Sequence, residues 1–109
     1  MKPLVKQITS DQFLNKVVEK KANALVKIGT AWNGASQMIS QTLQDLALQY
    51  GNQIDFFSID YEAESPLAIT YRVEDTPTIL FFKNGTLVDK LSGLTHRAVI
   101  SHKIFQLVY

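Results

Sequence analysis

The chain has 109 residues, of which 46% are hydrophobic, and this length allows one domain with a buried core and excludes two. Eleven basic and ten acidic residues leave a net charge of +1, so no overall field would attract nucleic acid or an anionic membrane. Because there is no cysteine, the chain cannot form a disulfide, a zinc–thiolate or iron–sulfur centre, or a cysteine nucleophile.

The first expected elements are a short strand at residues 4–8 and a helix that follows it. Thr9 and Gln12 have the spacing of a capping box, in which each side chain bonds the other residue's backbone N–H. Ile8 and Phe13 stand where a hydrophobic staple would join the strand to the helix. Residues 9–12 therefore predict a well-defined helix start.

A mostly apolar strand at 24–29 and a long helix come next. The continuous run "ALVKIG" is typical of a strand covered on both faces. Apolar residues from Ala35 to Tyr50 recur at helical spacing, and Gly51 is expected to end this helix in the usual C-terminal glycine position. A third strand is predicted at 54–60.

The second half begins with a short helix, for which Ser65 and Pro66 are the expected first residues. Strands at 78–83 and 86–91 flank Asn84–Gly85, a dipeptide that favours a two-residue hairpin. Thr95 is expected to cap a last helix. The residues expected on the buried side of that helix are Ile100, Ile104, Leu107 and Val108.

These elements predict an α/β fold. Helices separate the first three strands, which favours parallel crossovers, and the last two strands form an antiparallel hairpin. We therefore expect one domain over residues 1–109, with a central mixed sheet and helices on both faces. The N-terminal segment lacks the apolar run of a signal peptide, and no stretch approaches the length of a membrane span, so we expect a cytoplasmic protein.

Five segments in this order resemble the thioredoxin family, and together they cover nearly the whole chain. They are "ITSDQF", "ALVKIGTAWNGASQM", "FFSIDYEAESPLAITYRV", "DTPTILFFKNG" and "LSGLTHRAVI". The resemblance implies a thioredoxin-like fold, with the second segment as the family's active-site loop and the fourth as the segment around its cis-proline.

The resemblance fails at the reactive groups, because "WNGAS" stands in place of the family's WCGPC. Asn33 and Ser36 occupy the positions of the two cysteines, and Ala35 stands where the family often has proline. Neither an amide nor a hydroxyl undergoes disulfide exchange. Lys27 replaces the family's buried acid, which assists proton movement. We therefore expect no thiol–disulfide oxidoreductase activity, no catalytic residue and no cofactor.

What the resemblance does carry over is a groove for an extended peptide. The expected lining residues are Trp32, Asn33, Gly34, Ala35, Ser36, Thr76, Pro77 and Gly93. If Pro77 follows a cis peptide bond, the backbone of Thr76 can pair with the peptide as an added strand does.

Four of the positions singled out by the resemblance have structural alternatives. Trp32 is either an exposed anchor for a partner or a lid packed on the following helix. Asn33 and Ser36 are expected to act as helix caps. Lys27 needs a carboxylate partner or a lowered pKa if it is buried, and we favour a side chain that reaches the surface past Gly29.

No metal site is expected. His96 and His102 are six residues apart on the last helix, which places them on different faces. The acidic segment "DYEAES" lacks the glycine and distal glutamate of a calcium loop.

The function expected from the sequence is that of a redox-inactive protein-binding or chaperone-like module. Its partner would be a protein or an extended peptide, with no nucleic acid or membrane involved, and the chain would be a monomer or a weak homodimer. Two alternatives stay open: a thioredoxin oxidoreductase whose cysteines were replaced, and a subunit kept only for its fold.

Overall fold

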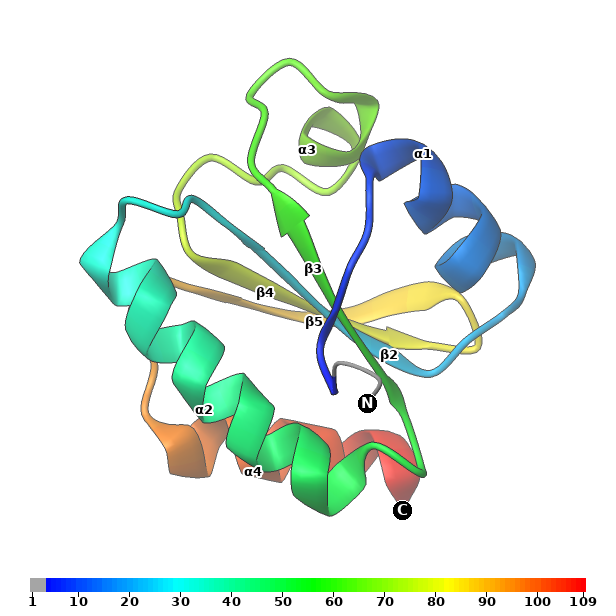
Figure 1. Ribbon diagram of the computed structural model, residues 1–109. Helices are drawn as coiled ribbons and strands as arrows, with labels where there is room; N and C mark the ends of the chain where they lie inside the picture. The colour runs from blue at the N-terminus through cyan, green and yellow to red at the C-terminus, as the bar shows by residue number, and fades with distance from the viewer. Residues whose placement is uncertain (1–3) are drawn as a thin grey trace.

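The computed structural model describes residues 4–109 and shows a five-stranded mixed sheet with helices on both faces (Figure 1). In chain order the elements are β1 (Lys6–Gln7), α1 (Ser10–Phe13), the π-helical η1 (Leu14–Glu19), β2 (Ala24–Gly29), α2 (Gly34–Tyr50), β3 (Asp55–Asp60), α3 (Pro66–Thr70), β4 (Thr78–Lys83), β5 (Thr86–Ser92) and α4 (Arg97–Val108). The expected α/β class and element order are confirmed.

The strands lie in the order β1-β3-β2-β4-β5. β3 pairs in parallel with both β1 and β2, whereas β4 runs antiparallel to β2, and β5 antiparallel to β4. The parallel crossovers and the hairpin predicted from the sequence are therefore present. In the β2–β3 pair, Lys27 lies opposite Ser58 and Gly29 opposite Asp60.

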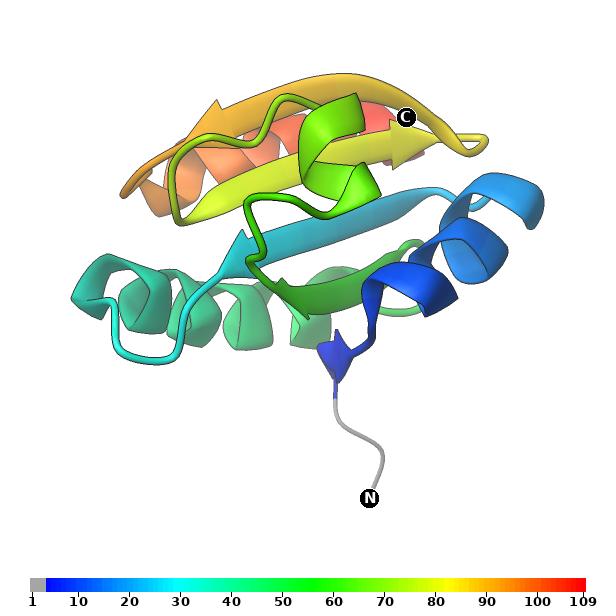
Figure 2. The same cartoon turned by 90° about the horizontal axis from the view of Figure 1, so that it is seen from above.

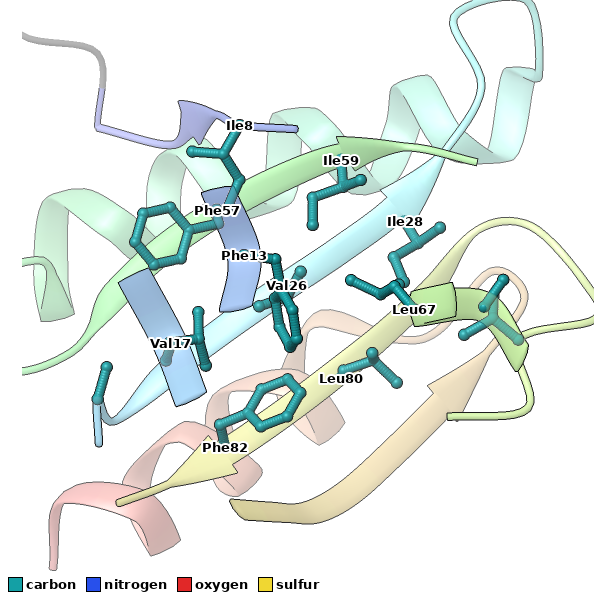
Figure 3. Packing of buried hydrophobic residues seen from close by; sticks show 14 residues of the cluster. Ile8, Phe13, Val17, Val26, Ile28, Phe57, Ile59, Leu67, Leu80 and Phe82 are labelled. Carbon is teal, nitrogen blue, oxygen red and sulfur yellow. The ribbon is translucent and has the colours of Figure 1, made fainter. Parts of the chain in front are cut away.

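Two apolar layers hold the helices on the sheet. α1, η1 and α3 cover one face over a cluster that includes Phe13, Val26, Phe57 and Phe82 (Figure 3). α2 and α4 lie on the opposite face, over a cluster that includes Leu25, Leu43, Phe81 and Ile104 (Figures 1 and 2). Every residue of β2 is buried, which confirms the prediction of a strand covered on both faces.

The N-terminal helix starts as its sequence predicts. The Gln12 N–H donates to the Thr9 Oγ1 atom at 3.2 Å, and the Thr9 N–H donates to the Gln12 Oε1 atom at 3.0 Å. Ile8 and Phe13 are both buried in the same apolar cluster, as a staple requires. The strand expected at 4–8 is shorter, because only Lys6 and Gln7 form ladder pairs at this sheet edge, although the Ile8 N–H still reaches the Ser58 carbonyl at 2.9 Å.

Gly51 ends α2 as predicted and is its C-cap; with φ −64° it continues into a right-handed turn, in which the Ile54 N–H bonds the Tyr50 carbonyl. The start of α4 differs from expectation. The N-cap of α4 is His96, whose Nδ1 atom accepts from the Ala98 N–H at 3.4 Å. The expected cap, Thr95, lies one residue before it, and its hydroxyl donates to the Gly93 carbonyl at 3.2 Å.

The other expected features are present. Ile100, Ile104 and Leu107 are the buried residues of α4, while Val108 is half-buried. Asn84 and Gly85 have positive φ angles of 54° and 80°, as a two-residue hairpin turn requires. Across residues 4–109, none of the helices has both the length and the apolar character needed to cross a membrane.

Candidate functional site

Asn33 forms the N-terminus of α2 and ties it to a second loop. Its Oδ1 atom accepts from the Ser36 N–H at 3.1 Å, and its carbonyl accepts from the Gln37 N–H at 3.0 Å. Its Nδ2 atom donates to the Thr76 carbonyl at 3.4 Å. The predicted capping role of Asn33 is confirmed, and the same amide joins the loop before α2 to the loop before β4.

Ser36 does not cap the helix, contrary to expectation. It lies in the first turn of α2 and is fully buried, and its Oγ atom accepts from the Thr30 N–H at 3.2 Å. The hydroxyl therefore points back toward the end of β2. Because it has no exposed surface and no hydrogen bond to a histidine among residues 4–109, Ser36 has none of the surroundings of a nucleophilic serine.

Three loops meet at one end of the sheet, on the left in Figures 1 and 2. Besides the Asn33–Thr76 bond, the Gly93 N–H donates to the Pro77 carbonyl at 2.7 Å. The Thr76–Pro77 peptide bond is cis, as predicted. We call the surface formed by Trp32, Asn33, Thr76, Pro77 and Gly93 the three-loop surface.

Most of the predicted groove residues belong to this end of the sheet. Gly34 is exposed at the start of α2, Ala35 is half-buried behind it, and Pro77 is buried next to the half-buried Thr76. Of the predicted lining, Ser36 is fully buried and Pro77 is buried as well, so the side chains left to touch a partner are those of the other residues.

Trp32 is 84% exposed, which excludes the interpretation of this side chain as a lid. A lid packed on α2 would lose most of its accessible surface, whereas an anchor has to keep it in the free protein. The loop that carries Trp32 is fixed by Gln37, whose Nε2 atom donates to the Ala31 carbonyl at 2.7 Å. The indole is therefore an apolar surface on a braced loop.

The backbone of Thr76 is only half available to a partner. Its carbonyl accepts from Asn33, whereas its N–H has no partner among residues 4–109. A hydrogen-bond acceptor is therefore the kind of group that the Thr76 N–H could bind.

Lys27 is buried, so the expectation that it reaches the surface is wrong. It keeps 8% of its accessible surface, and its Nζ atom donates to the Ser40 Oγ atom at 2.7 Å. Loss of hydration lowers the pKa of Lys27 below the ordinary value of 10.5, and the charge of Asp60 opposes that shift. No sequence pattern pointed to Ser40 as the partner, although it lies one turn after Ser36 on α2.

Gly29 makes room for this arrangement. A Cβ atom at Gly29 would lie 2.1 Å from the Ser36 Oγ atom and 2.8 Å from the Lys27 Cε atom. The lysine therefore bends along the sheet between β2 and α2 and does not run past Gly29 to solvent. The Thr30 Oγ1 atom next to it is buried and has no hydrogen-bond partner within residues 4–109.

Replacing Lys27 by Met should stabilise the protein by about 1 kcal/mol at neutral pH, because an apolar chain fills the site without burying a charge. Between the lowered pKa of Lys27 and 10.5, the unfolded state binds more protons than the folded state. Parental stability should therefore rise with pH in that window, and the advantage of Lys27→Met should shrink.

Urea unfolding of the parent and of Lys27→Met between pH 7 and 10.5 measures the difference in their free energies of unfolding. The titration of all other groups is common to both proteins and cancels in that difference. A variant less stable than its parent at neutral pH would contradict the expected cost of burying Lys27.

The residues considered for metal binding are not brought together. In the part of the chain that the structure describes, no group of three or more histidine and acidic side chains is placed to hold a metal ion. His96 serves as the cap of α4, and His102 is exposed on the same helix.

A single mixed sheet, a helix that starts directly after a Trp-containing loop and a cis-proline beside that helix define the thioredoxin class of α/β domain. The family model described as thioredoxin matches residues 4–106. The chain belongs to the thioredoxin family.

Individual relatives agree with this assignment. The chain is 32% identical over 87 residues to a thioredoxin of Staphylococcus aureus, covering 80% of this chain and 82% of that protein. It is 28% identical over 99 residues to the chloroplastic M-type thioredoxin of Pisum sativum, covering 90% of this chain and 58% of the pea protein. A thioredoxin variant from Halobacterium salinarum has the same fold, with a TM-score of 0.85 and 23% identity over 100% of this chain and 96% of that one.

Proposed function

We propose that this protein is a redox-inactive thioredoxin-like module that binds a protein or an extended peptide without forming a covalent bond. The observation that carries the proposal is the 84% exposed Trp32 beside the Asn33–Thr76 junction. A large aromatic side chain on a braced loop loses little conformational entropy on binding, and tryptophan is enriched among residues that dominate interface energies.

The chemistry of the site supports non-covalent capture. The chain contains no thiol, so it cannot form a mixed disulfide with a substrate through a group of its own. Asn33 uses its side chain for the α2 cap and for Thr76, and Ser36 is buried. A partner would instead gain contact area on Trp32 and a hydrogen bond from the Thr76 N–H.

We place this function in the cytoplasm, with a monomeric or weakly dimeric protein. Nucleic acid and membranes are not proposed as partners, because the net charge of +1 offers little electrostatic attraction to either.

Affinity capture from the source organism's lysate tests the proposal. One bait is the parent chain, and a second carries Trp32→Ala with Thr76→Arg, which removes the anchor and obstructs the Thr76 N–H. A third bait carries Leu48→Ala and is the matched control, because Leu48 is 72% exposed but lies near the opposite end of α2.

We expect partners that the parent and the control retain and that the double variant binds at least roughly tenfold more weakly, as the loss of a binding hot spot would produce. Circular dichroism first establishes that all three baits fold. Identical partners on all three baits, or none on any, would refute the proposal.

A subunit kept for its fold is the second candidate, and the exposed Trp32 also suits a contact between two copies. Analytical ultracentrifugation of the parent and of Trp32→Ala distinguishes the two. A dimer that Trp32→Ala dissolves would favour self-association through the three-loop surface over capture of another protein.

A further inference from the structure

The buried Lys27 has no carboxylate partner in the part of the chain that the structure describes. The ion pairs found there join Arg97 to Asp45 and Lys103 to Asp89. The Lys27 ammonium group has three N–H donors, and one hydrogen bond is found for it, to Ser40. A buried charge in a protein is normally paired with an opposite charge. The Lys27 ammonium group has no such ion pair among the described residues.

A pocket adjoins this ammonium group between α2 and the β1 side of the sheet. Its volume is about 170 Å³, well above the ~10–15 Å³ that one buried water needs by a comparable measure. The polar residues that line it are Gln7, Lys27, Ser40, Gln44 and Ser58. The rest of its wall is apolar and comes from Val5 and Leu43.

We propose that this pocket binds a small inorganic anion of the size of chloride against the Lys27 Nζ atom. The anion would supply the missing counter-charge and accept hydrogen bonds from the lysine. The amide groups of Gln7 and Gln44 and the hydroxyl of Ser58 are further donors on the same wall.

The charges around the pocket suit one anion. From β1 the facing polar group is Gln7, from α2 Ser40 and Gln44, and from β3 Ser58, all of them uncharged. The acidic group that acts on Lys27 is Asp60, which is exposed at the end of β3 and accepts from the Gln7 Nε2 atom at 3.5 Å. Because Asp60 is exposed, solvent weakens the effect of its negative charge on the pocket more than it weakens the effect of the buried Lys27 charge.

This site is separate from the three-loop surface, because its ligand groups come from the sheet and the middle of α2. Binding there would stabilise the fold and hold Lys27 in its charged form. It does not depend on the proposed capture of a peptide, and the two are tested by different experiments.

The test compares thermal unfolding in potassium chloride with unfolding in potassium gluconate at equal ionic strength, since gluconate is much bulkier than chloride and should approach the Lys27 Nζ atom less closely. Screening is the same in both salts, so a difference that saturates with chloride concentration reports a bound anion, whereas exclusion of an anion from the protein surface changes the Tm without saturation. For the parent chain we expect the Tm to be roughly 5–10 °C higher in chloride once chloride is about tenfold above its dissociation constant. The effect should saturate with concentration.

Two variants identify the site. Lys27→Met should abolish the chloride effect. Lys20→Met, which removes an exposed lysine at the end of η1, should keep it. Equal Tm values of the parent in both salts would overturn the proposal, and so would a chloride effect that survives in Lys27→Met.

A second measurement needs no variant and keeps the proposal testable if Lys27→Met does not fold. In NMR spectra of the parent, the Lys27 15Nζ signal should shift saturably with chloride and stay fixed with gluconate. A signal that responds equally to both salts, or to neither, would overturn the assignment of the pocket.

Discussion

Restoring both cysteines with Asn33→Cys and Ser36→Cys should produce at most feeble disulfide reductase activity. In an ordinary thioredoxin the acid beneath the cysteines assists proton movement, and here that position holds Lys27, bonded to Ser40. Positioned acid–base groups typically contribute about 10²–10⁴-fold, so we expect activity at least roughly 100-fold below that of an ordinary thioredoxin.

The matched variant adds Lys27→Asp to the two cysteines. The reductase activity of the double and the triple variant is measured by insulin reduction with dithiothreitol. The triple variant should be the more active, because the introduced carboxylate would supply the missing acid–base group. Full activity from the two cysteines alone would contradict the claim that the site differs from a thioredoxin in more than its thiols.

Gly29→Ala should destabilise the protein by about 1–3 kcal/mol, which is the usual cost of extra volume in a packed interior. The new Cβ atom would lie 2.1 Å from the buried Ser36 Oγ atom. Lys27 is a more flexible neighbour, at 2.8 Å from its Cε atom. The strain therefore falls mainly on Ser36 and on the bond that it accepts from Thr30.

Gly34→Ala is the control for this substitution, since nothing lies within 4 Å of a Cβ atom at Gly34. It should change the free energy of unfolding by no more than about 1 kcal/mol. Adding Ser36→Ala to Gly29→Ala should recover part of the loss, as a double-mutant cycle in urea unfolding measures. Equal effects of the two glycine substitutions would show that the packing at Gly29 is looser than described.

The elements were predictable where local chemistry determines them. Thr9 with Gln12, Ser65 with Pro66, and Asn84–Gly85 each specify a helix start or a turn through bonds within a few residues. The continuous apolar run of β2 indicated its place inside the sheet. Gly51 ends α2 as predicted, whereas the N-cap of α4 is His96 and not the predicted Thr95, whose hydroxyl donates to the Gly93 carbonyl.

The site was predictable in outline but not in its interior. The resemblance placed Trp32, Asn33, Thr76, Pro77 and Gly93 together, and hydrogen bonds bring the last four of them to one end of the sheet. The resemblance could not predict which way the Lys27 side chain points, because the family has an acid and not a lysine at this position. Lys27 turns inward because Ser40 and Gly29 offer it a partner and room, and Ser40 is 13 positions away in the chain.

Family membership therefore does not by itself assign the family's activity to this chain. The backbone of the thioredoxin site is kept, with its helix cap and cis-proline, while each position that performs redox chemistry carries another kind of group. A fold can host a site whose use has changed, so the activity has to be argued from Trp32, Thr76 and Lys27.

Fluorescence of Trp32 tests the central claim most directly, because it is the single tryptophan of the chain and is 84% exposed. The measurement is a titration with tryptophan-free peptides that cover the sequence of a captured partner. The account predicts that at least one extended peptide shifts the emission to the blue as it buries the indole, and that Thr76→Arg removes the shift. Peptides that bind, by calorimetry, without changing the Trp32 emission would contradict the account and place the function on another face of the molecule.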